Sequence, residues 1–150
     1  MAETDLIKLY SERILQLAAD IPLTDKLERP DATVRKRSPL CGSAVTVDVV
    51  VSDGRVVDYS QDVKACALGQ ASASVLARTV IGRSAPELQV ARDELMAMLT
   101  RDGVAPQAPF DGFEVLLPAR DFTNRHASIM LAIDATIDAI AEASAKAAAE

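Results

Sequence analysis

The chain has 150 residues, of which 49% are hydrophobic and only 3% aromatic, and its formal net charge at pH 7 is -6. This length suffices for one ordinary domain with its own core, so we expect a single domain over residues 1–150. The acidic balance argues against a nucleic-acid partner, because phosphate binding requires clustered Lys and Arg, and the basic cluster at residues 35–37 is too short.

The N-terminal segment carries acidic residues where a secretory signal would be basic. No apolar run approaches the roughly 20 residues that a membrane-spanning helix requires. We therefore expect a cytoplasmic protein without a membrane partner. In that compartment Cys41 and Cys66 are expected to be reduced, which makes a structural disulfide the less favoured use of the pair.

The first predicted elements are a helix and an edge strand. From Asp5 to Ile21 the apolar residues recur at steps of three and four, which predicts an amphipathic helix. Thr4 is a candidate N-cap for this helix, and Pro22 ends it. After an irregular polar stretch, residues 32–38 are consistent with a short edge strand.

Alternating valines give the clearest strand signal. Val45, Val47, Val49 and Val51 share one face of a strand, and the turn residues 52–54 lead into a partner strand over residues 55–63. The pattern predicts an antiparallel sheet of two or three strands whose apolar face must be covered by helices.

Three helices are predicted after the sheet. The first begins just after Cys66 and has Gly82 as its C-terminal cap, and the second begins at a capping box in residues 84–87 and runs to about Arg101. An irregular link follows over residues 104–124. Isoleucines at helical spacing, from Ile129 to Ile140, mark the last helix, so the fold class is α+β.

Three side chains carry the candidate chemistry: Cys41, Cys66 and His126. Their spacing alone is a weak metal signal, because a free Cys is usually buried and a lone His is usually structural. Cys41, however, lies on a Pro/Gly turn, and Cys66 precedes a helix whose N-terminal dipole would stabilise a thiolate. His126 lies beside the start of the last helix, so the three donors could converge at one pole of the domain.

Nucleophilic catalysis is the competing use of the same side chains. In that hypothesis Cys66 would be the thiolate, His126 its base, and Asp62 or Asp58 the orienting carboxylate. Nothing in the spacing selects this arrangement.

The segments SPLCGS, TVDVVVSDGRVVDYS and CALGQASASVLARTVIGRS, taken in order, resemble the NifU/IscU/SufU-like family of iron-sulfur cluster assembly scaffolds. LIKLYSERILQLA is similar to the opening helix of that family, and LLPARDFTNRHASIMLAIDATIDAI is similar to its final segment. The resemblance implies the SufE/NifU-like (IscU-like) fold, in which a small antiparallel sheet of about three strands is covered by helices.

Two departures from the family pattern bear on the site. Ser43 stands where the family has an aspartate beside the first cysteine, and the third cysteine is absent. His126 either replaces that cysteine or matches a histidine that some members carry just before it. In the second case Ala127 takes the place of the cysteine.

The resemblance implies a non-enzymatic scaffold or carrier that binds iron or a [2Fe-2S] cluster through Cys41, Cys66 and His126, with Ser43 as a further metal ligand. A fourth donor would come from Ser43, Asp62, water, a small thiol or a second protein, because three donors leave a tetrahedral site open. The implied partners are a cysteine desulfurase and cluster-acceptor proteins, with a homo-oligomer possible. The alternative is a zinc-binding, sulfur-accepting accessory of the desulfurase. A fold that has lost its site and serves as an interaction module is a further alternative.

Overall fold

The computed structural model describes residues 10–39 and 42–149. These residues form a three-stranded sheet, α-helices and a stretch of 3-10 helix. In chain order the elements are α2 (Glu12–Ala19), β1 (Ala32–Arg37), β2 (Ala44–Ser52), β3 (Arg55–Lys64), α3 (Ala67–Ala77), α4 (Ala85–Thr100), η1 (Asp111–Asp121), η2 (Thr123–Arg125) and α5 (His126–Ala149).

The sheet is antiparallel in the order β1-β2-β3, which confirms the predicted hairpin and the predicted edge strand. The hairpin turn has positive φ at Asp53 (53°) and Gly54 (75°), as a tight connection between twisted strands requires. Val45 pairs with Val63, and the register slips by one residue between Val50 and Val51. The α+β class predicted from the valine pattern is therefore the observed one.

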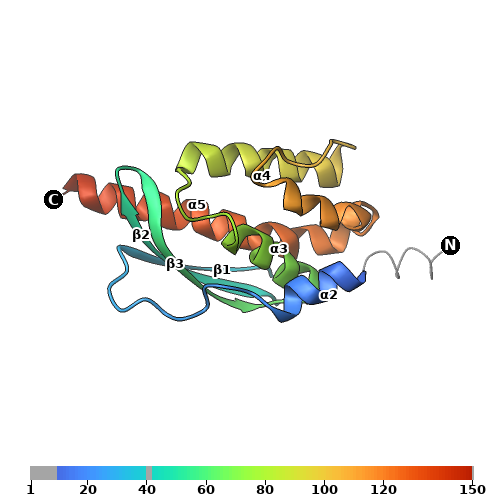
Figure 1. Ribbon diagram of the computed structural model, residues 1–150, viewed down its shortest axis with the longest axis horizontal. Coiled ribbons are helices and arrows are strands. Elements are labelled where there is room, and N and C mark those ends of the chain that lie inside the picture. The colour runs from blue at the N-terminus through green and yellow to red at the C-terminus, as the bar shows by residue number, and fades with distance from the viewer. Residues whose placement is uncertain (1–9, 40–41, 150) are drawn as a thin grey trace.

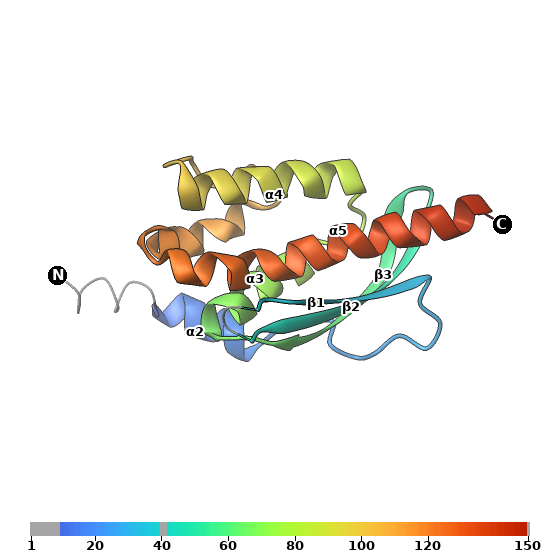
Figure 2. The same cartoon turned by 180° about the vertical axis from the view of Figure 1, so that it is seen from behind.

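Helices cover one face of the sheet. Helix α5 packs along β1 and β2, α3 lies beside α5, and α4 forms an outer layer on α5 (Figure 1 and Figure 2). The loop that connects α2 to β1, residues 20–31, runs along the opposite side of the sheet in both views. The sheet thus has a helix-covered inner face and an outer face that this loop approaches.

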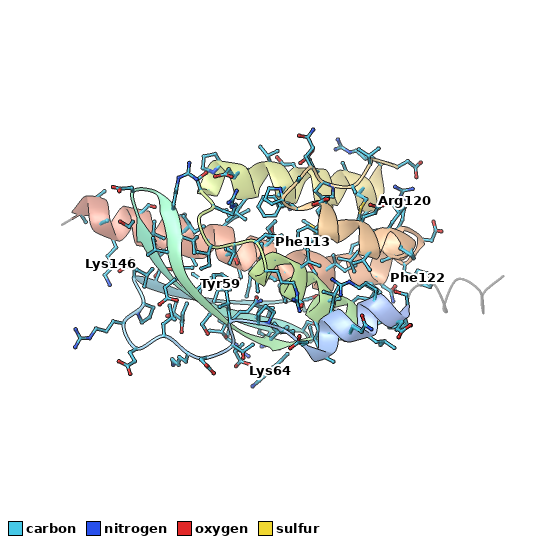
Figure 3. All side chains as sticks on the ribbon, in the orientation of Figure 1. Tyr59, Lys64, Phe113, Arg120, Phe122 and Lys146 are labelled. Carbon is cyan, nitrogen blue, oxygen red and sulfur yellow. The ribbon has the colours of Figure 1, made fainter. Side chains whose placement is uncertain are left out.

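The inner face is joined to α5 by a buried polar cluster around Tyr59. The phenol oxygen of Tyr59 lies 2.7 Å from the hydroxyl of Thr136 on α5 and 3.2 Å from the side-chain oxygen of Gln61. Burial raises the pKa of the Tyr59 phenol far above its usual range, although the bond to Thr136 opposes this shift. Figure 3 shows Tyr59 between the strands and the helices. The cluster fixes the position of α5 along the sheet.

The prediction of one continuous helix from Asp5 to Ile21 is wrong. Helix α2 begins at Glu12 with Ser11 as its N-cap, whose side chain accepts a hydrogen bond from the Ile14 amide at 3.3 Å, and it ends at Ala19 rather than at Ile21. The serine competes with helical backbone bonding, so it starts a helix rather than continuing one. The proposed cap Thr4 lies outside the described residues.

The later helices differ from expectation in two places. The capping box between Ser84 and Glu87 is confirmed, but Gly82 does not cap α3. Helix α3 ends at Ala77, and the Gly82 amide donates instead to the Val56 carbonyl of β3 at 2.8 Å. Much of the link predicted to be irregular forms the 3-10 helix η1. No helix among residues 10–39 and 42–149 is long and apolar enough to cross a membrane.

Candidate functional site

The turn between β1 and β2 is closed by its own backbone. The Ser38 amide donates to the Ser43 carbonyl at 2.8 Å, the Gly42 amide donates to the Ser38 carbonyl at 2.9 Å, and Gly42 has a φ of 71°. A side chain at Gly42 would be strained at this φ, so glycine is required there. The predicted ligand Cys41, next to Gly42 in the chain, lies outside the described residues, and its role as a ligand stays a prediction.

Cys66 is the N-cap residue of α3. Its φ and ψ are -66° and 170°, and its side chain makes no capping hydrogen bond to the helix. The thiol is free and partly buried. The placement of this cysteine at the start of a helix agrees with the sequence prediction, and it leaves the sulfur available to groups outside α3.

One hydroxyl group lies beside the Cys66 sulfur, and a second lies behind it. The Ser128 oxygen, in the first turn of α5, lies 3.6 Å from the Cys66 sulfur and 3.2 Å from the Ser43 oxygen. Ser43 is 4% exposed and Ser128 is 2% exposed. The three side chains thus form a continuous row of hydrogen-bonding groups. Because each hydroxyl has one proton, Ser43 can donate to Ser128 while Ser128 donates to the sulfur.

Ser128 was not predicted as a site residue. Its position two residues after His126 could have indicated it. Helical periodicity alone, however, does not determine which side chain in the first turn of α5 faces α3. The structure supplies that information through Gly69. A Cβ atom at Gly69 would lie 2.5 Å from the Ser128 oxygen, so α3 and α5 approach too closely there for any larger residue.

His126 is the first residue of α5 and is buried. Its Nε2 atom lies 3.0 Å from the Ala119 carbonyl oxygen and 3.1 Å from the Arg120 carbonyl oxygen. Since carbonyl oxygens only accept, Nε2 carries a proton and donates to them. This arrangement leaves Nδ1 as the nitrogen that could bind a metal ion.

The carbonyls that accept from His126 belong to an anchored segment. The guanidinium of Arg120 donates to the Met98 carbonyl at 2.8 Å and to the Gly103 carbonyl at 2.9 Å, which ties the end of η1 to the end of α4. Figure 3 shows Arg120 and Phe122 together at the end of the molecule where η1 leads into α5. The 3-10 segment therefore orients the imidazole.

A hollow of about 410 Å³ lies beside His126, between the end of β1, α4 and the start of α5. Its lining includes Pro39, Met96, His126, Ala127 and Met130. The hydroxyl of Ser38, also in the lining, is buried without a hydrogen-bond partner among the described residues. His126 and Ala127 thus share one hollow with the residues that directly precede Leu40 and Cys41 in the chain.

The two carboxylates that the hydrolase hypothesis needed lie elsewhere. Asp58 and Asp62 are exposed on β3 and alternate with the inward-facing Tyr59 and Gln61, so they occupy the outer face of the sheet. In the described part of the chain, no hydrogen bond joins His126 to Cys66 or to either aspartate, and no group of three or more His, Cys, Asp or Glu side chains could hold a metal ion. A triad built on Cys66 has no support in this geometry.

A three-stranded antiparallel sheet covered on one face by helices, with a cysteine at the start of the first covering helix facing the start of the last, defines the IscU-like class of small α+β proteins. Comparison with family models gives the same result at the level of sequence. The chain belongs to the family of the NifU-like N terminal domain, whose model matches residues 9–149. This finding confirms the resemblance seen in the two cysteine segments.

Similar proteins include solved structures and one curated relative. A crystal structure of a nitrogen-fixing NifU-like protein (N-terminal) from Brucella abortus is 44% identical, with a TM-score of 0.91, and the match covers 95% of this chain and 99% of that one. A putative iron-sulfur cluster assembly scaffold protein for the SUF system from Fervidobacterium islandicum shares the fold at 20% identity, with a TM-score of 0.77 and coverage of 89% of this chain and 98% of that one. The iron-sulfur cluster assembly scaffold protein IscU of Thermotoga maritima is 35% identical over 82 residues, which is 53% of this chain. The match spans 56% of that relative's length.

Proposed function

We propose that this protein is a non-enzymatic scaffold of iron-sulfur cluster assembly, which receives iron and sulfide as substrates and holds the resulting [2Fe-2S] cluster for transfer. Membership of the NifU-like family and the scaffold names of its relatives support this assignment. The structural observation that carries it is the position of the Cys66 sulfur, which is free at the start of α3 and 3.6 Å from the first turn of α5.

The proposed ligands are Cys41, Cys66 and Nδ1 of His126, with the hydroxyl of Ser43 as a further oxygen donor. Thiolates suit iron-sulfur centres, and exchanging a thiolate for an imidazole weakens electron donation and raises the cluster potential. Because Nε2 of His126 donates to two carbonyls, the orientation of the ring would already be set before Nδ1 binds a metal ion. Three strong donors leave one position, which the weakly binding Ser43 hydroxyl, water, a small thiol or a partner protein would fill.

Two kinds of partner follow from this proposal. A cysteine desulfurase would deliver the sulfur, and an acceptor protein would receive the cluster. A site that is open by one ligand suits both exchanges, because an incoming protein thiol can complete the coordination without displacing a resident donor. A second copy of this chain could supply the same missing ligand.

Anaerobic reconstitution with ferrous iron and sulfide tests the proposal. The wild-type protein should develop visible sulfur-to-iron charge-transfer absorption, and Cys41→Ser and Cys66→Ser should each abolish it. Asp58→Asn is the matched control, because Asp58 lies on the outer face of the sheet, and it should leave the spectrum unchanged. A wild-type protein that stays colourless, while remaining folded by circular dichroism, would refute the cluster assignment.

A zinc-binding accessory of the desulfurase is the second candidate function. It is supported by the composition of the donor set, because two cysteines and one histidine with water in the fourth position form an ordinary zinc site. Elemental analysis of protein purified without chelators distinguishes the two functions, since the accessory would contain stoichiometric zinc without acid-labile sulfide and the scaffold would contain iron with sulfide.

A further inference from the structure

The outer face of the sheet holds a second polar site, away from the cysteines. A cavity of about 400 Å³ lies between this face and the connecting loop of residues 20–31. Two hydrogen bonds hold the loop against the sheet. The backbone N–H of Gln61 donates to the Leu23 carbonyl at 3.0 Å, and the backbone N–H of Leu27 donates to the Asp48 carboxylate at 3.3 Å. Figure 2 shows this loop on the side of the sheet away from α4 and α5.

Four oxygen-bearing side chains form the floor of this cavity. Thr46 is paired with Asp62, and Asp48 is paired with Ser60, in adjacent rows of the β2–β3 ladder. Residues directly opposite in such a ladder have Cβ atoms about 5 Å apart, and residues two apart along one strand are about 7 Å apart, so the four side chains stand at the corners of a small rectangle. The two aspartates give this group a negative charge.

Ser60 has an unused hydrogen-bonding group. The residue is 3% exposed, it lines the cavity, and its hydroxyl makes no hydrogen bond to any residue in the described part of the chain. Asp48 is 4% exposed and forms no ion pair with a described residue, although its two oxygens accept from Thr33 at 2.7 Å and from Leu27. The Ser60 hydroxyl is not among the fully enclosed side-chain atoms without a partner, so it faces the open space of the cavity. There it and the Asp48 carboxylate can both form hydrogen bonds to a ligand.

The chemistry of the floor selects the kind of cation. A hard metal ion needs about six to eight oxygens, several of them from carboxylates, and the lining of this cavity has only two carboxylates, Asp48 and Asp62. A primary ammonium needs only three acceptors, which Asp48, Ser60 and Asp62 can supply. The apolar side chain of Ile21 lines the same cavity and can contact an alkyl chain.

We propose that this cavity binds a small alkylammonium ion, with the ammonium group against Asp48, Ser60 and Asp62 and the alkyl chain against Ile21. The site is independent of the proposed cluster function, because it lies on the opposite face of the sheet from α5. Lys26 lines the rim of the cavity and forms no ion pair with a described residue. Its positive charge opposes binding and therefore limits the affinity.

Titration of the 15N-labelled protein with n-butylammonium chloride at constant ionic strength tests the site. Saturable shifts are expected for the amides of Thr46, Ser60 and Asp62. The neutral analogue 1-butanol should produce none of them. A parallel titration with potassium chloride measures how the same amide shifts respond to a monovalent cation without an alkyl chain. This control is needed because the protein has a net charge of -6 and attracts cations in general.

Variants separate this site from general attraction to an acidic surface. Asp62→Asn should weaken n-butylammonium binding by about tenfold, because it removes a charge-assisted hydrogen bond, and Lys26→Met should strengthen it. Asp58→Asn removes an equal charge from the same face of β3 outside the cavity and should change the affinity less than about twofold. Shifts that do not saturate, equal effects of Asp62→Asn and Asp58→Asn, or equal binding of 1-butanol would each overturn the proposal. Melting curves of all three variants confirm that they are folded.

Discussion

The hydroxyl of Ser128 lies 3.6 Å from the sulfur of Cys66, and it joins the first turn of α5 to the start of α3. Ser43 extends this contact to the beginning of β2 at 3.2 Å. Three segments that are far apart in the sequence therefore meet through side chains at the proposed cluster site. Their contacts lead to predictions about the cluster, about the helix packing and about the residues at the start of α5.

Replacing Ser128 with alanine should lower the reduction potential of the reconstituted cluster. A hydroxyl that donates to a ligating sulfur withdraws electron density and stabilises the reduced state, so its loss favours the oxidised state. Unfolding free energy should also fall by about 1 kcal/mol, the usual value of one hydrogen bond. Redox titration of wild type and variant measures the first effect. An unchanged potential would show that Ser128 does not donate to a cluster ligand.

Replacing Gly69 with alanine should destabilise the protein, although alanine ordinarily stabilises a helix by about 1 kcal/mol relative to glycine. The new Cβ would lie 2.5 Å from the Ser128 oxygen and 2.8 Å from the Ala65 Cβ, so α3 and α5 must move apart. Overpacking of this kind costs about 1–3 kcal/mol. Denaturant unfolding of Gly69→Ala and of Gly69→Ala combined with Ser128→Ala measures the coupling.

The double variant should recover part of the loss, because the closest clash is with the serine oxygen. Gly112→Ala is the control, since its nearest neighbour is a Val75 methyl group at 3.3 Å. Strictly additive effects of the two changes would contradict the proposed contact.

Two substitutions of His126 should separate its structural role from its ligand role. His126→Gln retains an amide N–H that can donate to the Ala119 and Arg120 carbonyls but removes the Nδ1 donor. It should keep near-native stability and lose iron binding. His126→Asn is too short to reach these carbonyls and should lose about 1–3 kcal/mol of stability, the cost of unsatisfied buried groups. Thermal unfolding and iron content are measured for both. Iron content in His126→Gln equal to that of wild type would remove His126 from the ligand set.

A cysteine at position 127 should strengthen metal binding. Ala127 is exposed and lines the hollow that also contains His126 and Pro39, so Ala127→Cys would add a thiol next to the proposed ligands. Zinc affinity should rise by at least about tenfold, because a zinc-thiolate bond contributes more than the 1.4 kcal/mol that a tenfold change represents. Asn124→Cys adds an equally exposed thiol outside the hollow and is the control in competition titrations with a chromophoric chelator. Equal gains from both variants would contradict the placement of the site.

The capping box of α4 should make stability depend on pH. Desolvation opposes ionisation of Glu87, but hydrogen bonds from the Ser84 amide, the Arg55 guanidinium and the Ser84 hydroxyl, with the charge of Arg83, outweigh it and lower the pKa. Since the folded pKa lies below the unfolded value of about 4.3, the stabilisation is full above that value and is lost as the pH falls through the folded pKa.

Glu87→Gln should therefore be less stable than wild type at pH 7, by less than about 1 kcal/mol because the carboxylate is partly exposed to solvent. The difference should shrink as the pH is lowered from about 6 to 3 in urea unfolding series. A difference that is constant over this range would show that the charge of Glu87 does not contribute.

Local patterns in the sequence were sufficient for the elements of the fold. Alternating valines specified the sheet and its buried face, and the spacing of Ser84 and Glu87 specified the start of α4, because both depend on hydrogen bonds and burial within a few residues. The position of Cys66 at a helix start was predicted for the same reason. The end of α3 and the start of α2 at Glu12 were not predicted, because backbone contacts with β3 and a local serine cap outweighed helical periodicity.

By itself, then, the sequence determined the order of strands and helices, the family, and the residue types available as ligands. Only the tertiary structure decided that Ser128 faces Cys66, that Nε2 of His126 is already bonded to backbone carbonyls, and that a loop encloses a polar cavity over Asp48. The physical reason is that hydrophobic periodicity fixes which face of an element is buried, whereas the partners of its polar atoms depend on how distant elements pack against one another.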